Sequence, residues 1–234
     1  MTKFYVFALI IIASIGGANR IFAQQTQPTP TVKPAFEEWK DDFAGAKLNE
    51  NLWEKFTFEG GSGGKLEVKD GELRIRGGNK TRAGVRSVKS FTGERFIVEA
   101  QVAKVGAPLP EPGNNTILPG FANLTILFDG SGRNRVEWGL TSDGNLEAWI
   151  VKDGQGERLD NRTLATKMKN PYLSIVRRGD EFLFVINKPD GKPEDAQIGL
   201  TKVIKNLPKS FHLMLYGYGS SENNWNSARV VVAK

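Results

Sequence analysis

From Phe36 to the C-terminus, short runs of alternating apolar and polar residues are separated by clusters of Gly, Asp, Asn and Pro. Beyond Glu54, no segment keeps the periodicity of an amphipathic helix. The runs recur roughly every 8 to 12 residues, which is typical of β-sandwiches and β-barrels. This pattern predicts an all-β fold of about a dozen strands, arranged as an antiparallel two-sheet β-sandwich of the jelly-roll type.

The sequence LEVKDGELRI predicts a β-hairpin closed by a two-residue loop, Asp70-Gly71. Such a loop favours a type I′ turn. The turn would pair Val68 with Leu73, so that the apolar residues of both strands share one face. Glu67 and Arg74 would then oppose each other on the other face.

The sequence RVEWGLTSDGNLEAWIV predicts a second hairpin. A two-residue Asp143-Gly144 loop would place Glu147 on the apolar face of Trp138. A three-residue loop that starts at Ser142, with Gly144 in the left-handed conformation, instead aligns the apolar residues of both strands. The two loops differ in this way because a shift of one residue exchanges the two faces of a strand. The three-residue loop is predicted, since it places the apolar residues of both strands on one face. It leaves these residues on the face away from the core: Arg135, Glu137, Glu147, Trp149 and Val151.

The remaining runs predict further strands and one long loop. The loop covers residues 108–119, between two strands. The predicted strands cover residues 55–58, 84–91, 95–104, 121–129, 172–177, 181–187, 210–217 and 228–233.

The N-terminus predicts an export signal. Lys3 precedes an apolar run over residues 4–15, which is shorter than the ~20 residues that a membrane-spanning helix needs. Residues 1–23 are therefore predicted to be a signal peptide, 24–36 a Pro/Thr/Gln-rich linker, and 37–234 the folded domain. This organisation predicts a secreted or periplasmic protein without a membrane span.

Charge and residue usage exclude several classes of function. The net charge is +6, and the basic residues are scattered among carboxylates, so a nucleic-acid partner is not expected. The chain has no Cys and one His, which argues against thiol nucleophiles, Ser-His-Asp triads and multi-histidine zinc sites. His212 is interpreted as a partly buried residue bonded to a backbone carbonyl.

Tryptophans are the best candidates for a binding surface. An exposed Trp149 would stack on a pyranose ring, while Arg135, Glu137 and Glu147 contact its hydroxyl groups. Alternatively, a second layer or the 108–119 loop covers Trp149. A second candidate site is Trp225 with Asn224, which the Asn-rich sequence SSENNWNS places at a loop tip; this sequence is equally compatible with turn formation alone.

Three segments resemble concanavalin A-like lectins and glucanases. DDFAGAKLNENLWEKF, with Trp53, resembles the first strand of these domains. PYLSIVRRGDEFLFVINKPDGK is similar to a strand-turn-strand stretch of the laminin-G-like domain appended to beta-xylosidases, and SARVVVAK is similar to its last strand. The resemblance implies the fold more than any activity.

The sequence departs from the superfamily in two features, the acidic residue that binds structural calcium and the catalytic motif of the glucanases. Members that bind structural calcium usually carry an acidic residue in the last strand, where this chain has Ala228, Arg229 and valines. Asp41 and Asp42 alone do not form a calcium site, so no cofactor is expected. Glucanases of the superfamily use Glu-x-Asp-x-Glu on one strand, and here no Glu is followed two positions later by Asp or Glu. No catalytic residue is therefore assigned.

The sequence thus favours an exported carbohydrate-binding module that recognises a polysaccharide or another glycan. One alternative is a glycoside hydrolase or polysaccharide lyase with a non-standard site. A second alternative is a structural or protein-binding domain of the cell envelope.

Overall fold

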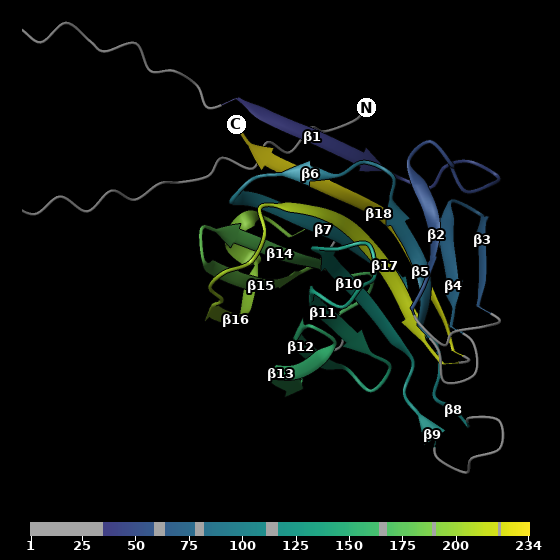
Figure 1. The fold of residues 1–234 in the computed structure, drawn as a ribbon. Helices are drawn as coiled ribbons and strands as arrows, with labels where there is room; N and C mark the ends of the chain where they lie inside the picture. Colours follow the sequence, from purple (N-terminus) through teal and green to yellow (C-terminus); the bar gives the residue numbers. More distant parts are fainter. Residues whose placement is uncertain are drawn as a thin grey trace, which may run out of the picture. The chain divides into compact units, whose positions relative to one another are not determined.

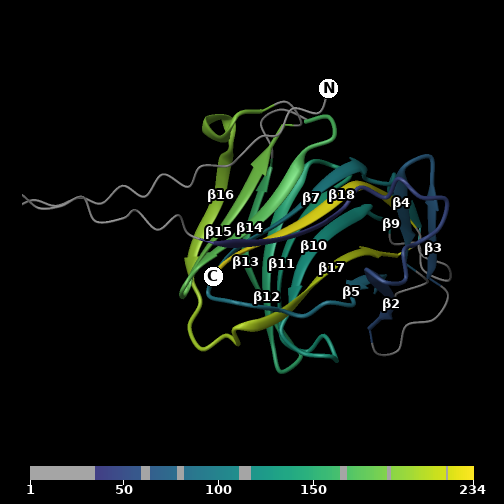
Figure 2. The same cartoon turned by 90° about the horizontal axis from the view of Figure 1, so that it is seen from above.

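The computed structural model describes residues 35–58, 64–77, 82–110, 117–163, 168–188, 191–219 and 221–234. Ala35–Lys234 forms one compact unit built from two antiparallel sheets of eight strands each. The two sheets lie face to face (Figures 1 and 2). The predicted all-β sandwich is confirmed.

The first sheet, here called sheet A, is centred on β7 and β18. Its strands, from one edge to the other, are β16 (Gln197–Val203), β15 (Glu181–Asn187), β14 (Tyr172–Arg178), β7 (Arg95–Lys104), β18 (Glu222–Ala233), β4 (Glu72–Arg76) and β3 (Lys65–Lys69), with β1 (Phe36–Asp41) also paired to β18.

The second sheet, here called sheet B, is centred on β10 and β17. Its strands are β13 (Gln155–Thr163), β12 (Asn145–Lys152), β11 (Arg135–Thr141), β10 (Phe121–Leu127), β17 (Ser210–Tyr218), β5 (Arg82–Ser87) and β2 (Trp53–Thr57), with β6 (Phe91–Thr92) also paired to β17. A small hairpin, β8 (Leu109–Pro110) with β9 (Ile117–Leu118), and a 3-10 turn, η1 (Pro193–Asp195), complete the described elements. In the described residues, no helix is long and apolar enough to cross a membrane.

Apolar side chains of alternate residues fill the space between the sheets. Trp53, Trp138 and Trp225 are among the largest side chains buried there. The Trp138 indole also links the two sheets directly, because its Nε1 donates a hydrogen bond to the Val185 carbonyl, 2.9 Å away. With no disulfide available, burial of apolar surface in this large core is the main stabilising term.

Both predicted hairpins are confirmed, including their pairing. Val68 pairs with Leu73, and the loop residues Asp70 and Gly71 have φ angles of 55° and 75°, as a type I′ turn requires. In the second hairpin, Glu137 pairs with Trp149, and Gly144 has a φ of 87°. The three-residue loop therefore sends Trp138 into the core and leaves Trp149 on the other face.

The strand predictions differ from the structure mainly at the edges of the sheets. Strands 95–104 and 181–187 have the predicted bounds, whereas the expected strand 84–91 is divided into β5 and β6. Among the described residues, five strands were not predicted: β1, β13, β16 and the two-residue strands β8 and β9, which lie within the predicted loop 108–119. They lie at sheet edges or pair with one neighbour only, so their sequences carry a weaker apolar alternation. The predicted signal peptide and all of the linker before Ala35 lie outside the described residues, and β1 begins within the last linker position.

Candidate functional site

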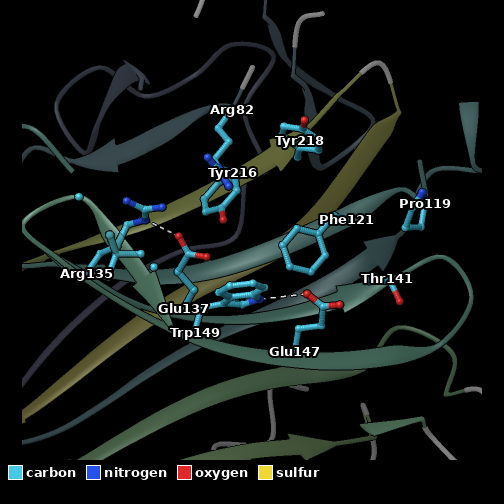
Figure 3. Close-up of a pocket in the computed structure, with 13 residues that line it drawn as sticks. Arg82, Pro119, Phe121, Arg135, Glu137, Thr141, Glu147, Trp149, Tyr216 and Tyr218 are labelled. Carbon is cyan, nitrogen blue, oxygen red and sulfur yellow. Dashed lines mark hydrogen bonds and ion pairs between the residues drawn. The ribbon is translucent and has the colours of Figure 1, made fainter. Parts of the chain in front are cut away.

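The face of sheet B that points away from the core holds a pocket of about 350 Å3. Strands β10, β11, β12 and β17 form its floor, with alternate residues of each strand pointing into it. Figure 3 shows aromatic, acidic and guanidinium side chains from these strands around one space. The residues that line the pocket are Arg82, Pro119, Phe121, Arg135, Glu137, Thr141, Glu147, Trp149, Val151, Gly154, Gly156, Tyr216 and Tyr218.

Trp149 on β12 contributes a half-buried indole to the pocket. Its Nε1 donates a hydrogen bond to Oε2 of Glu147, 2.9 Å away. The Arg158 guanidinium, from the neighbouring strand β13, lies 5.8 Å from the ring centre. Trp149 therefore has a fixed orientation and is not sealed by a second layer, so the geometry predicted for it from sequence is confirmed.

Glu137 and Arg135 on β11 form an ion pair in the floor of the pocket. The two residues are only 3% and 7% exposed, respectively. Sequence reasoning placed them on the correct face but did not indicate how deeply they are buried. The outer face is curved and carries large neighbouring side chains, so residues in the middle of the sheet are covered.

Two further polar residues complete the environment of Glu137. Asn123 on β10 donates hydrogen bonds through Nδ2 to the Tyr216 hydroxyl at 2.8 Å and to Glu137 Oε2 at 3.5 Å. Tyr216 on β17 is fully buried, and burial, together with the negative charge of Glu137, raises the pKa of its phenol well above the ordinary value. The Tyr216 hydroxyl is therefore neutral at physiological pH.

Aromatic and guanidinium groups form the side of the pocket near β2 and β5. The Arg82 guanidinium lies 5.9 Å from the Phe58 ring centre and 5.5 Å from that of Tyr218. On the floor, Phe121 lies against Gly139, where an added Cβ would come within 2.4 Å of the ring. The glycine at this position thus lets the Phe121 ring lie across β11.

Sequence reasoning did not assign Tyr216 and Tyr218 to the site. It also missed Arg82, Phe121 and Asn123. Alternation along β10 and β17 places the aromatic and amide side chains of these strands on one face, whereas Arg82 belongs to β5 and precedes the strand predicted from residue 84. Only the order of strands in the sheet brings these groups next to β11 and β12.

Trp225 and Asn224 are not part of this pocket, and their predicted position at a loop tip was wrong. Both lie in β18 of sheet A; the Trp225 side chain is fully buried in the core, and Asn224 is 5% exposed. Asn224 donates a hydrogen bond to Oε2 of Glu72 at 2.8 Å, and the neighbouring Asn223 accepts one from the backbone N–H of Gly106 at 3.1 Å. These amides satisfy buried backbone and side-chain groups, so an Asn-rich sequence continues as a strand here.

His212 and Asp41 have structural roles in the fold. Nδ1 of His212 lies 2.8 Å from the Ser87 carbonyl, as expected for a histidine bonded to the backbone. Asp41 Oδ2 accepts a hydrogen bond from Nε1 of Trp53 at 2.7 Å. The described residues contain no cluster of three or more His, Cys, Asp or Glu side chains that could hold a metal ion. The absence of a cofactor stays a prediction.

Comparisons with known proteins define the fold. No protein-family model and no curated protein matches the chain. Three solved structures illustrate the similarity. A beta-1,3-1,4-glucanase (lichenase) from a mouse hindgut metagenome has 10% identity over 84% of this chain and 99% of its own, with a TM-score of 0.59. The carbohydrate binding module CBM66 from Bacillus subtilis has 12% identity over 76% of this chain and 96% of its own, with a TM-score of 0.53. The exoplasmic/lumenal domain of VIP36, in its Ca2+/Man3GlcNAc-bound form, has 12% identity over 78% of this chain and 84% of its own, with a TM-score of 0.55.

The chain therefore has the concanavalin A-like jelly-roll fold. This confirms the fold that the resemblance of the sequence segments implies. The narrower resemblance to the laminin-G-like domain of beta-xylosidases stays a prediction, since identities of 10% to 12% establish the fold alone.

Proposed function

We propose that this chain is an exported carbohydrate-binding module that holds a glycan in the pocket of sheet B and has no catalytic activity of its own. The observation that carries the proposal is the half-buried Trp149 indole, held by Glu147 in a pocket of about 350 Å3. A pyranose ring presents an apolar face that packs on an indole, and its hydroxyl groups need polar partners at the rim. The predicted signal peptide supports the exported location.

Strand β11 supports a binding role over catalysis. A retaining glycosidase needs two carboxylates, an acid/base and a nucleophile, on either side of the bond that is cleaved. The residues of β11 that line the pocket are Arg135, Glu137 and Thr141, which include a single carboxylate. That carboxylate is held by the Arg135 guanidinium and the Asn123 amide.

A glycoside hydrolase or polysaccharide lyase is the second candidate, because Glu137 and Glu147 both line the pocket. An enzyme would release new reducing ends or unsaturated products from a panel of polysaccharides. In that case Glu147→Gln, which keeps the side-chain volume, would abolish product formation. Absence of product from every substrate that the protein binds supports the binding module.

Affinity electrophoresis with immobilised polysaccharides tests the binding proposal. Trp149→Ala is expected to weaken retention roughly tenfold or more, as removal of a central aromatic contact does at other interfaces. The free energy of unfolding should change by less than about 1 kcal/mol, because the side chain lies outside the core.

The matched control is Phe36→Ala. Phe36 is an exposed aromatic residue on β1 of sheet A, outside the pocket, with 52% of its surface accessible. Its substitution should leave retention unchanged. Equal retention of the Trp149→Ala protein and the parent would reject the pocket as the binding site.

A further inference from the structure

The arrangement of charges around the pocket indicates what kind of glycan it accepts. The charged groups that line it or lie against its Trp149 platform, among the residues that the structure describes, are the guanidinium groups of Arg82, Arg135 and Arg158 and the carboxylates of Glu137 and Glu147. Cations therefore exceed anions by one. A negatively charged group of a ligand is expected to bind at the guanidinium group that has no carboxylate beside it.

The negative charge of Glu137 is already offset by a neighbouring guanidinium group. It forms its ion pair with Arg135, and both side chains are almost fully buried. A buried carboxylate paired in this way is costly to separate from its partner. Glu137 is therefore not available to neutralise a second guanidinium group by direct contact.

Glu147 and Arg158 lie on the other side of the pocket. Glu147 accepts the hydrogen bond of the Trp149 indole, and the Arg158 guanidinium lies over the same ring. These opposite charges flank one side chain, so they largely offset each other. They leave no excess charge at this end.

Arg82 is the cation without a carboxylate in direct contact: its guanidinium donates a hydrogen bond to the Tyr216 hydroxyl, and the charge of Glu137 acts on it only from beyond ion-pair distance. Arg82 is exposed on β5, and no carboxylate of the described residues forms an ion pair with it. The rings of Phe58 and Tyr218 instead lie 5.9 Å and 5.5 Å from its guanidinium carbon. Aromatic faces stabilise a guanidinium group without using the N–H groups at its edge. A guanidinium group has five N–H donors, so the hydrogen bond to Tyr216 leaves others for an oxyanion, which a planar guanidinium can bind through two parallel hydrogen bonds.

We propose that the pocket binds an acidic glycan, with a carboxylate or sulfate ester of the sugar on Arg82 and a neighbouring ring on Trp149. This inference rests on the proposed function, since it assigns a ligand class to the same pocket. A neutral glycan would leave the Arg82 charge facing the ligand without a partner. An acidic glycan gains a charge-assisted hydrogen bond there.

The test compares polymers that differ only in charge. Binding of the full chain to a polyuronate is measured by titration calorimetry, alongside the same polymer after reduction of its carboxyl groups. Dextran sulfate and dextran form the second pair. We expect the acidic member of at least one pair to bind about ten- to hundredfold more tightly, the contribution of one charge-assisted hydrogen bond. Preference for the polyuronate identifies a carboxylate as the ligand group, and preference for dextran sulfate identifies a sulfate.

Two arginine variants assign the effect to its residue. Arg82→Gln should remove the preference for the acidic polymer. Arg95→Gln is the control, because Arg95 is an exposed arginine on β7 of sheet A, and it should keep the preference. An equal loss in both variants would indicate non-specific attraction to a basic protein and would overturn the inference.

The inference and the proposed function fail in different ways. If charged and uncharged polymers bind equally and Trp149→Ala weakens both, the glycan site stands and the acidic ligand class is wrong. If Trp149→Ala changes no interaction with any polymer, the pocket does not bind glycans and both proposals fall.

Discussion

Two glutamates, one in each sheet, lie on the face that points away from the core and are accommodated differently. Glu137 on β11 of sheet B is paired with a guanidinium group and bonded by an amide. Glu99 on β7 of sheet A accepts a hydrogen bond from the Ser174 hydroxyl at 2.9 Å. The guanidinium nearest to it, on Arg229, forms its own ion pair with Glu38 at 3.1 Å.

The difference lies in the counter-ion that each carboxyl group has. Burial raises the pKa of Glu99 above its ordinary value, and the Ser174 hydroxyl and the Arg229 charge offset this only in part. Glu137 has its counter-ion in direct contact. The pocket therefore holds a buried ion pair, whereas sheet A tolerates a carboxyl group whose pKa burial raises. Fixed charges on one face are what a polar ligand needs.

The largest effect on stability is expected from removing the buried carboxylate of the pocket, Glu137. Glu137→Ala leaves Arg135 buried without its partner and should lower the free energy of unfolding by about 3–5 kcal/mol. Replacing both residues with apolar ones, Arg135→Met with Glu137→Leu, should restore most of this loss. Urea denaturation of the three proteins measures it. A single variant as stable as the parent would show that the pair is not buried as described.

An intermediate effect, dependent on pH, is expected from Glu99→Gln. Because the folded-state pKa of Glu99 is raised, the folded protein binds more protons than the unfolded chain between the ordinary pKa and the raised one. This residue therefore makes the parent less stable as pH rises through that interval. The glutamine cannot ionise, so the variant should gain about 1 kcal/mol relative to the parent on the alkaline side, roughly one hydrogen bond.

Denaturation at a series of pH values from about 4 upward follows this difference, starting near the ordinary glutamate pKa. The gap between variant and parent should widen with pH and then level off. A gap that is constant with pH would mean that the Glu99 carboxyl group titrates normally in the folded protein.

The smallest effect is expected from a carboxylate in open solvent. Glu67 on β3 lies 3.8 Å from the Arg74 guanidinium, and 59% of the Glu67 side chain is exposed. Glu67→Gln should change the free energy of unfolding by less than about 0.5 kcal/mol, since water and salt screen such a pair. Urea denaturation at low and high salt checks this. A loss comparable with that of Glu137→Ala would show that burial is not what separates the three glutamates.

Local sequence predicted the central strands and both hairpins well. The Asp70-Gly71 dipeptide specifies a turn with two left-handed residues, and Gly144 permits a bulged loop. Once each turn is fixed, the strict alternation of a strand assigns every residue of the hairpin to a face. Trp138 and Trp149 could be placed on opposite faces for this reason.

Burial and strand order could not be predicted in the same way. Trp225 was misplaced because Asn-rich sequences usually form turns, and only the contacts of Asn223 with Gly106 and of Asn224 with Glu72 allow a strand there. The edge strands β13 and β16 carry weak patterns, because an edge strand buries less of each face.

The amino-acid sequence by itself determined the class of fold, the two hairpin pairings and the outward direction of Trp149, because turn chemistry and alternation act between neighbouring residues. Only the tertiary structure decided that Arg82, Asn123 and Tyr216 surround the Arg135–Glu137 pair. Those residues come from strands far apart in the chain, and the order of strands in sheet B brings them together. The pocket depends on contacts between distant segments, which no local pattern encodes.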